Sequence, residues 1–565
     1  MRRFLDIVVQ RRTIVLLLTG LIVYTAFIGL RSLWYPDELD IAEVTRAMFL
    51  SGDWVSPRRM GVIWVDYPPM IYWIGTISSH LLGSMSAFSL RLPNALAAIA
   101  TILLTAGFAR RCFGDKAGFW TGFTLLTFLL FVYEGNSYRP DVTFTLAISA
   151  GMFSYARGSG EHSNLLLRML AFVFFGLAML SKGPLGLLLP GLVLVVWLAL
   201  QRNWRSIFEL APLSLIALLV YGAWFLNTGS AMGMSEMLYE FYAQNFERFL
   251  TSENRGHGQP WFYYLRNFWL DFSPWSWLFP VAVVWLYRAG KLRERNVQLA
   301  ALWFAIFFVF LSLAATKRQL YLLPAFPAAA VLLGVWLAEV TSDTHAKHAG
   351  TGATAVRLFS WAIAAVFVVL GAALIWAVPN LQGLVADRQL TSQEMEIAGT
   401  IGVPLVLLGI VLIGSSVALV AAWRTGGKSA ALLTVGAVHI SLYVVLLGLV
   451  LPTFEPVKSY EPQSRWISET IGDEPRFGMV DIAGVPRRGG FSYYTGTAVD
   501  LIEGPAEAAA YLQTYPQTIV LVRSNQFEQD FPEFMANSRF TLLRELRVGS
   551  HLYVVLGPGT DLNDS

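Results

Sequence analysis

The chain contains only one cysteine, Cys112, and has few charged residues for its length. A single cysteine excludes an intrachain disulfide, a thiolate zinc site and an iron–sulfur cluster. Charged residues make up 14% of the 565 residues and hydrophobic ones 55%, whereas an ordinary soluble domain is roughly 25% charged. These shortages exclude a disulfide-rich secreted domain and indicate a membrane protein that is held together by packing within the lipid phase.

The chain also lacks a strong net charge. The formal value of +3 gives neither the basic footprint of a nucleic-acid-binding protein nor an acidic tail. We therefore expect membrane lipids and no nucleic acid among its partners. What matters instead is where along the chain the basic residues lie.

About thirteen apolar stretches have lengths suited to helices that cross a bilayer. They are 13–30, 91–109, 117–133, 141–156, 165–180, 184–200, 208–226, 274–288, 299–315, 320–339, 357–377, 402–422 and 430–451. No small-residue cleavage site follows the first stretch, so we expect it to be retained as a helix and not removed as a signal peptide. The predicted fold class is a polytopic α-helical membrane protein.

Lys and Arg in alternate short loops indicate the orientation of the chain, because such residues collect on the cytoplasmic side. With a cytoplasmic N-terminus, the loops on that side contain Arg110, Arg111, Lys116, Arg157, Arg202, Arg205, Arg288, Lys291, Arg293, Arg295, Lys347, Arg357, Arg424 and Lys428. An odd number of crossings then puts the C-terminus outside. The longer segments 31–90, 227–273, 378–401 and 452–565 are expected on the same outer side.

The segment 452–565 differs in character from everything before it. It is polar and mixed, with helical patterns at QSRWISET and AEAAAYLQTY and strand patterns at RFGMVDIAG, TIVLVRS and HLYVVLG. We expect a small α/β domain outside the membrane, following a membrane domain over 1–451. It contains no catalytic motif, which favours a scaffold or lid.

The first outer segment carries an acidic group in RSLWYPDELDIAEVTR. Asp37 and Glu38 open a helical pattern, so helix capping or a solvated turn is the plain local interpretation. Asp66 follows in WVDYPPMIYW, directly before a predicted interfacial helix over 69–83. Three carboxylates are thus expected near the outer membrane surface.

Basic residues also occur on the outer side, where the positive-inside rule depletes them. Each one alone is explained as an anchor whose charge reaches the membrane surface. Together with the carboxylates they predict a site for a lipid phosphate, with a carboxylate left to accept a proton. These outer polar residues are Arg139 and Asp141 in EGNSYRPD, Lys182 in SKGP, Arg248 and Arg255 in the aromatic loop, and Lys317, Arg318 and Tyr321 in ATKRQLYLLPAFP.

Seven motifs, taken in order, resemble the bacterial aminoarabinose transferase and protein O-mannosyltransferase-like families. They are PDELDIAEVTRAMFLSGDWVSP, DYPPMIYW, SLRLPNAL, SYRPD, LSKGPLG, NFERFL with GQPWFYYL, and KRQLYLLPAFPAAA, within residues 1–340. These families are membrane glycosyltransferases of the GT-C class, which use sugars linked to polyprenyl phosphate. The resemblance implies a GT-C fold of about thirteen transmembrane helices with outer interfacial helices.

The resemblance also implies roles for individual residues. Asp37, with Glu38, Asp66 and Asp141, would be catalytic. Arg248 and Tyr321 would hold the donor phosphate, with further charge from Lys182, Lys317, Arg139 and Arg255. A divalent cation, Mg²⁺ or Mn²⁺, bridging Asp37 and Asp66 is a further expectation.

One departure from the family pattern stands out. Aminoarabinose transferases typically have Glu-Lys-Pro in the first outer loop, whereas this chain has Asp66, Tyr67 and Pro68. A phosphate-binding lysine is therefore absent from that position. Lys182 or Lys317 would have to supply the charge, or the donor differs.

The predicted function is an inverting transfer of sugar from a polyprenyl-phosphate donor to a lipid A, glycan or protein acceptor at the periplasmic face of a bacterial inner membrane. One alternative is a transporter or lipid flippase, which predicts ionisable residues near the middle of broken helices. Another is a non-catalytic scaffold, which leaves the outer carboxylates and cations without a common purpose. The predicted spans contain almost no internal charge, which favours chemistry at one surface.

Overall fold

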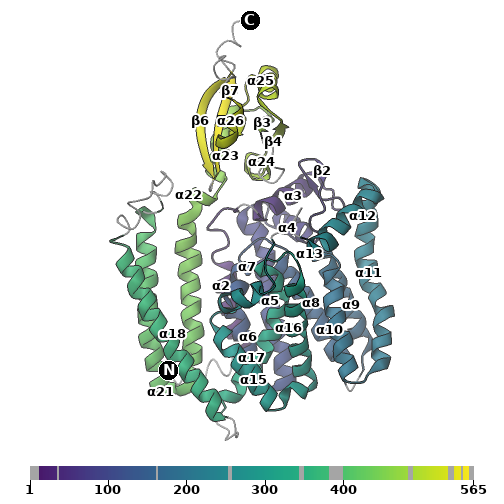
Figure 1. Ribbon diagram of the computed structural model, residues 1–565, viewed down its shortest axis with the longest axis vertical. Coiled ribbons are helices and arrows are strands. Elements are labelled where there is room, and N and C mark those ends of the chain that lie inside the picture. Colours follow the sequence, from purple (N-terminus) through teal and green to yellow (C-terminus); the bar gives the residue numbers. More distant parts are fainter. Residues whose placement is uncertain are drawn as a thin grey trace.

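The computed structural model describes residues 12–34, 37–160, 163–251, 258–342, 349–380, 397, 399–480, 488–531, 540–548 and 551–558. A bundle of long helices forms the larger part of the molecule, and a β-sheet with its own helices lies beyond one end of the bundle (Figure 1). The short helices α3 and α4 lie at that end, beneath the sheet.

The bundle is built from apolar helices that follow the predicted stretches. They are α2 (Arg12–Thr25), α5 (Ala87–Phe113), α6 (Asp115–Thr127), α7 (Leu129–Gly135), α8 (Asp141–Gly158), α9 (Leu165–Lys182), α10 (Leu185–Leu200), α11 (Trp204–Met232), α15 (Leu278–Arg288), α16 (Arg295–Leu313), α17 (Phe326–Val340), α18 (Ala349–Ala377) and α21 (Gly402–Val445).

Seven helices in the described ranges are long and apolar enough to cross a membrane, or eight if the pair α6 and α7, bent by 67°, is one span. This confirms a helix-rich chain with many apolar spans. The predicted count of thirteen transmembrane helices stays a prediction, because several of the remaining apolar helices are shorter than the length that a membrane span requires.

Short elements connect the bundle at the end that faces the sheet. They are α3 (Asp37–Ser51), β1 (Arg58–Arg59), β2 (Val62–Ile63), α4 (Met70–Leu81), α12 (Met234–Tyr242), η1 (Ala243–Glu247), α13 (Arg248–Leu250), α14 (Tyr263–Asp271), η2 (Trp275–Trp277) and η4 (Gln319–Ala325). Helix α4 begins directly after Pro69 and coincides with the predicted helix over 69–83. Proline suits this position because its fixed φ angle is already helical.

The sheet has five strands in the order β4-β3-β5-β7-β6. Its strands are β3 (Arg476–Val480), β4 (Ala498–Ile502), β5 (Val520–Arg523), β6 (Phe540–Val548) and β7 (His551–Pro558). Strands β4, β3 and β5 are parallel, whereas β7 is antiparallel to both β5 and β6. Its accompanying helices are α22 (Glu455–Lys458), α23 (Glu461–Ile471), α24 (Arg488–Thr495), α25 (Pro505–Thr514) and α26 (Ser524–Asp530).

Strands β4 and β6 were not predicted from the sequence. In β6, four consecutive residues from Leu542 to Glu545 are exposed, so the strand lacks the alternation that marks a half-buried strand. The predicted strands at 476, 518 and 551 and the predicted helices at 463 and 506 all coincide with elements of the structure.

The sheet region and the first outer segment share one apolar core. Leu39, Ile41 and Val44 of α3 belong to the same buried cluster as Tyr460 and Phe491 from the C-terminal part of the chain. Burial of shared apolar surface stabilises this arrangement. The sheet region is therefore packed directly on the helix that begins with Asp37.

Close packing of α17 on α6 requires a glycine at position 334. A Cβ atom there would lie 2.0 Å from the Thr121 hydroxyl and 2.6 Å from the Thr121 backbone nitrogen. Because backbone cannot rotate away, we expect Gly334→Ala to lower the stability by about 1–3 kcal/mol, measured as thermal unfolding in detergent.

The matched control is Gly191→Ala in α10, where a Cβ atom meets nothing within 4 Å. Alanine has the higher helix propensity, so this change should leave the unfolding midpoint unchanged or raise it. Equal midpoints for the two variants would contradict the packing assigned to Gly334.

Candidate active site

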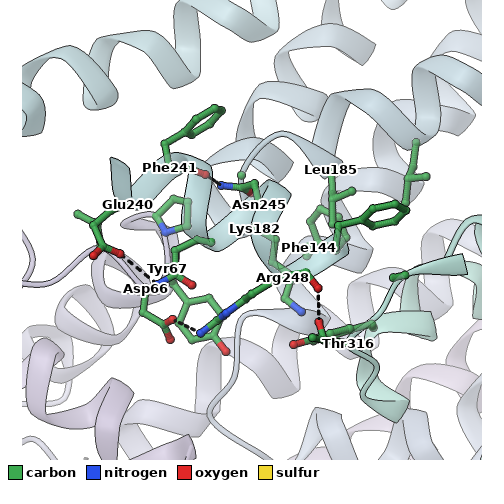
Figure 2. A pocket seen from close by; sticks show the side chains of 18 of the residues that line it. Asp66, Tyr67, Phe144, Lys182, Leu185, Glu240, Phe241, Asn245, Arg248 and Thr316 are labelled. Atoms are coloured by element: carbon green, nitrogen blue, oxygen red, sulfur yellow. Dashed lines mark hydrogen bonds and ion pairs between the residues drawn. The ribbon is translucent and has the colours of Figure 1, made fainter. Parts of the chain in front are cut away.

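A large pocket opens at the end of the bundle near α12 and α13 (Figure 2). It contains about 1170 Å³ of empty space, part of which is open to the surroundings. Most of its lining is apolar or aromatic, and its charged side chains are Asp66, Lys182, Glu240 and Arg248. The remaining lining residues include Tyr67, Phe144, Leu185, Leu189, Tyr221, Trp224, Phe241, Phe249, Phe307, Phe310 and Tyr321.

The charged lining residues are paired with one another or with close neighbours. The Arg248 guanidinium donates to the Asp66 carboxylate at 3.1 Å, and the Thr316 hydroxyl donates to the Arg248 carbonyl at 2.8 Å. The Lys182 ammonium binds Asp141 and lies 4.6 Å from the centre of the Tyr321 ring. The two cations of this mostly apolar pocket are thus each held by a carboxylate.

A glycine-proline turn positions Lys182. Lys182 is the last residue of α9, and Gly183 follows with a φ of 70°, a conformation that favours glycine. A Cβ atom on Gly183 would also lie 2.7 Å from Asn245 Oδ1. The SKGP sequence therefore ends α9 with its lysine directed into the site. The glycine also leaves room for Asn245 of η1 to approach closely.

A second cluster surrounds Asp37, the first residue of α3. Both carboxylate oxygens of Asp37 accept hydrogen bonds from the Arg318 guanidinium, and Arg139 Nη2 lies 2.9 Å from Asp37 Oδ2. Arg139 is held in turn by Glu134, with 2.9 Å between Nη1 and Oε1. Two guanidinium groups therefore face the Asp37 carboxylate.

Tyr67 connects the two clusters. Burial raises the pKa of its phenol well above the ordinary value, and the nearby charges of Asp66, Tyr321, Asp37 and Asp141 raise it further. The phenol is therefore neutral at physiological pH and available as a hydrogen-bond donor. Tyr67 lines the pocket together with Asp66 and Tyr321, so segments that are far apart in sequence meet at this point.

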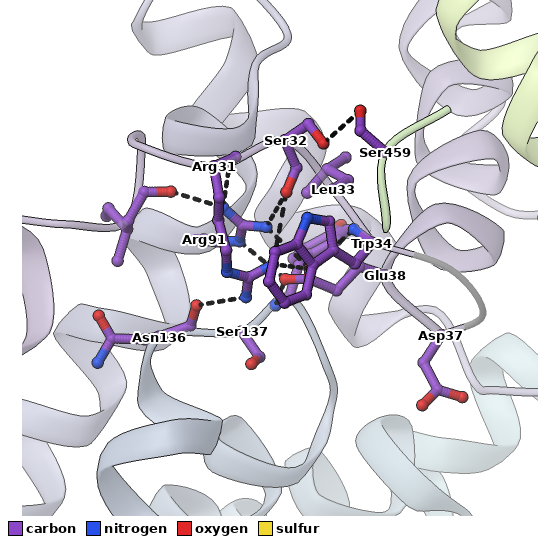
Figure 3. Close-up of polar contacts among 12 residues, drawn as sticks. Arg31, Ser32, Leu33, Trp34, Asp37, Glu38, Arg91, Asn136, Ser137 and Ser459 are labelled. Atoms are coloured by element: carbon purple, nitrogen blue, oxygen red, sulfur yellow. Dashed lines mark hydrogen bonds and ion pairs between the residues drawn. The ribbon is translucent and has the colours of Figure 1, made fainter. Parts of the chain in front are cut away.

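Glu38 has a different environment from its neighbour Asp37 (Figure 3). Its buried carboxylate accepts from Arg31 at 2.7 Å and from Arg91 at 2.8 Å through each oxygen. It also accepts from the backbone nitrogens of Trp34 at 3.2 Å and Tyr138 at 2.9 Å. Burial raises the pKa of Glu38, but Arg31 and Arg91 outweigh it and hold this pKa well below the ordinary value.

The structure does not bring all of the predicted residues into the pocket. Lys317 is buried, and its ammonium donates to the backbone carbonyls of Gln259 and Ala314. Asp37, Glu38, Arg139 and Asp141 are not among the residues that line the pocket. Arg255 lies outside the described residues.

The predicted divalent cation does not fit this arrangement. Among the residues that the structure describes, no group of three or more His, Cys, Asp and Glu side chains is arranged to hold a metal ion. The Asp37 oxygens face Arg139 and Arg318, and Asp66 faces Arg248. A bridging role of Asp37 and Asp66 is therefore not supported, because their oxygens are directed at guanidinium donors.

The chain is similar to several known proteins. The family model described as dolichyl-phosphate-mannose-protein mannosyltransferase matches residues 66–225. The undecaprenyl phosphate-alpha-4-amino-4-deoxy-L-arabinose arabinosyl transferase of Edwardsiella ictaluri is 30% identical over 55% of this chain and 57% of its own length. The Aeromonas salmonicida protein of that name is 30% identical over 62% of this chain and 64% of its own length.

Each of these two matches spans less than two thirds of the relative's own length. The similarity to solved structures covers more of this chain. The crystal structure of ArnT from Cupriavidus metallidurans bound to undecaprenyl phosphate superposes with a TM-score of 0.75 at 22% identity, covering 97% of this chain and 98% of that one. This chain has the ArnT fold.

The resemblance predicted from the seven motifs is thereby confirmed. The archaeal oligosaccharyltransferase AglB from Archaeoglobus fulgidus shares the architecture more distantly, with a TM-score of 0.53 at 12% identity over 92% of this chain and 70% of its own. Within the ArnT fold, the C-terminal sheet region is included in the superposition, whereas the sequence motifs cover only about the first 340 residues.

Sequence reasoning missed several residues that organise the site. Arg318 was noted as an outer cation but not assigned to the site, although it binds Asp37. Spacing alone cannot decide which of the neighbours Lys317 and Arg318 points inward. Glu134 and Arg91 fall within or beside apolar stretches, and a charge there is itself a signal of function or pairing.

Replacing Glu38 by Gln should destabilise the fold. The change leaves the buried Arg31 and Arg91 without a counter-charge, and breaking such a pair costs about 3–5 kcal/mol. Because the folded-state pKa of Glu38 is lowered, its contribution is complete at pH 7 and is lost as the pH falls below ~4.3. Thermal unfolding in detergent at several pH values measures both effects.

The exposed Glu469, on α23, provides the matched control. Glu469→Gln should leave the unfolding midpoint unchanged at every pH. A Glu38→Gln variant as stable as this control would show that the buried carboxylate is not needed for the fold.

Proposed function

We propose that this chain is an inverting membrane glycosyltransferase that moves a sugar from a polyprenyl-phosphate donor to an acceptor. The observation that carries the proposal is the pocket that Asp66, Tyr67, Lys182, Arg248 and Tyr321 line together. Its two cations are held there by the Asp141–Lys182 and Asp66–Arg248 ion pairs. Similarity to named arabinosyl transferases and to a structure that binds undecaprenyl phosphate supports the same reaction.

We also propose the orientation expected from the basic loops. The N-terminus lies in the cytoplasm, about thirteen helices within 1–451 cross the inner membrane, and residues 452–565 form a periplasmic α/β domain. The site then faces the periplasm, where the outer segments 31–90 and 227–273 meet. Two features support this: the site residues lie at the end of the bundle nearest the sheet, and the pocket is lined from both outer segments.

The donor's leaving group is a phosphate, so the reaction mainly requires neutralisation of the charge that develops as the glycosidic bond breaks. Arg248 and Lys182 supply positive charge from the pocket lining. The Tyr321 and Tyr67 phenols line the same pocket and can donate hydrogen bonds to phosphate oxygens. We infer that Lys182 provides the charge that the family lysine, replaced by Tyr67, would otherwise bring.

Carboxylates in the site hold these donors in place. Asp141 binds Lys182, and Asp66 binds Arg248. Each of these pairs must loosen when a phosphate anion arrives, because the anion competes for the same donors. Asp66 and Asp141 thus act as positioning residues for the phosphate-binding groups.

Asp37 is the carboxylate proposed to act on the acceptor. As a free carboxylate it can accept the proton of an attacking hydroxyl, but with both oxygens bound by Arg318 it is a weak base. A donor phosphate that draws Arg318 or Arg139 away would raise its basicity. Asp37 would then take the acceptor proton as the new bond forms on the face opposite the leaving phosphate.

The alternative of a transporter or flippase is less well supported. It requires ionisable residues near the middle of spans, accessible from both sides. Asp37 and Asp141 are the first residues of α3 and α8, Lys182 is the last of α9, and Arg248 begins the short α13. Charges at helix ends near one surface suit chemistry there, and their signs match the helix dipoles at Asp37, Asp141 and Lys182.

Asp37→Asn should reduce sugar transfer from a polyprenyl-phosphate donor in liposomes roughly 10²–10⁴-fold, because the proton acceptor is lost. Binding of undecaprenyl phosphate should be retained, since Arg248 and Lys182 remain. The exposed Asp473→Asn variant is the control and should transfer at the wild-type rate. Wild-type turnover in Asp37→Asn would rule out the catalytic role.

Arg248→Ala should weaken binding of undecaprenyl phosphate roughly 10-fold or more, because a charge-assisted hydrogen bond contributes about 1.5–3 kcal/mol. Binding in detergent micelles measures this directly. Arg266, which is exposed on α14 outside the pocket lining, gives the matched control Arg266→Ala, with unchanged affinity expected. Equal affinities for both variants would contradict phosphate binding by Arg248.

A further inference from the structure

The chain returns to the first outer segment after its last long helix. Glu455, the first residue of α22, accepts a hydrogen bond from the Ser32 backbone nitrogen at 3.1 Å through Oε1. Its other oxygen, Oε2, accepts from the Trp34 indole nitrogen at 3.0 Å. One carboxylate therefore binds two residues of the segment 31–34, which is more than 400 positions away in the sequence.

Two further residues of the C-terminal part bind the same segment. The Ser32 hydroxyl donates to the Ser459 hydroxyl at 2.8 Å (Figure 3), and Trp34 forms an isolated antiparallel bridge with Ser459. The Leu33 backbone nitrogen donates to the Tyr494 hydroxyl of α24 at 2.8 Å. Three consecutive residues, 32 to 34, are thus held from the side of the sheet.

The opposite side of the segment is held by the bundle. Arg91 donates to the carbonyls of Arg31 at 2.8 Å and Ser32 at 2.7 Å. Glu38 accepts from the Trp34 backbone nitrogen. Segment 31–34 is therefore fixed between the buried Arg91–Glu38 pair and Glu455, and helix α3 with Asp37 begins three residues after it.

We propose that Glu455 is a positioning residue for the reaction, which acts through Ser32 and Trp34 to fix the start of α3 and so the place of Asp37. This inference rests on the proposed role of Asp37. Glu455 is not one of the residues that line the pocket, and its carboxylate binds Ser32 and Trp34, whereas Arg139 and Arg318 bind Asp37. Its effect is geometric, and a displacement of about 1 Å at a reacting group can slow a reaction as much as 10²-fold.

This arrangement gives the C-terminal part a function that its own sequence does not reveal. A change in the packing of α22 or α24 would be transmitted to α3 through the segment 31–34 and the shared apolar core. The sheet region would thus influence turnover without contacting the substrate. Donor binding, which depends on Arg248 and Lys182, should be unaffected.

The first test compares full-length wild type with Glu455→Ala. Hydrogen exchange of the amides at 32–34 and in the first turn of α3 should become faster in the variant, because their partner is lost. Turnover with a polyprenyl-phosphate sugar should fall about 10-fold or more, whereas the affinity for undecaprenyl phosphate should not change. Glu469→Ala, on the exposed face of α23, is the control and should match the wild type in all three measurements.

A double-mutant cycle gives a sharper test that keeps the protein folded. Gln at 455 has one acceptor oxygen for the two donors, Ser32 and Trp34, so Glu455→Gln should slow turnover. Trp34→Phe removes the indole donor and should slow it as well. In the double variant the single acceptor oxygen of the glutamine at position 455 can still bind the Ser32 backbone nitrogen. Glu455→Gln should therefore not slow turnover any further when it is made in the Trp34→Phe variant.

The outcomes separate this inference from the proposed function. Wild-type exchange at 32–34 in Glu455→Ala overturns the positioning role whether or not the wild type transfers sugar. Fully additive effects in the Trp34 and Glu455 cycle overturn it too. A wild-type protein that transfers no sugar from any polyprenyl-phosphate donor counts against the proposed function, and the exchange measurement still decides the role of Glu455.

Discussion

The ion pairs of the buried Glu38 with Arg31 and Arg91 are the interaction on which the end of the bundle beneath the sheet depends. Removing charges from water is costly, and only the complete set of partners makes it tolerable. Through these pairs and the Tyr138 backbone nitrogen, Glu38 joins the segment after α2, which contains Arg31, to α3, α5 and the loop before α8. Four parts of the chain are thus fixed around one carboxylate.

The proposed chemistry uses residues that are adjacent in sequence to this fixed centre. Asp37 precedes Glu38, and Arg139 follows Tyr138, so one buried carboxylate holds both members of the Asp37–Arg139 pair in register. The neighbouring residues have opposite roles for a physical reason. Figure 3 shows the Glu38 side chain enclosed by its donors and the Asp37 side chain directed away from them. Asp37 binds Arg139 and Arg318 instead, the arginines that a phosphate displaces in the proposed reaction.

The pocket shows the same division between fixed and displaceable charge. Lys317 is satisfied by backbone carbonyls and contributes nothing to the pocket lining, whereas Lys182 is held by Asp141 and lies over Tyr321. A side chain bound by another side chain can exchange that partner for a ligand when the ligand is a strong acceptor such as a phosphate. A mostly apolar pocket lowers the local dielectric and so strengthens the interaction between a cationic side chain and a bound anion.

Much of the fold was determined by the sequence itself, because long apolar stretches form helices in a bilayer. Most of the site residues could also be proposed from the sequence, because they are charged residues in predicted outer segments, where basic residues are depleted. The choice between neighbours was decided by the tertiary structure. Asp37 and Glu38 look alike in the sequence, as do Lys317 and Arg318, because local patterns do not reveal which partners arrive from distant segments. The hold of Glu455 on the segment 31–34 is of the same kind, since it depends on contacts across most of the chain.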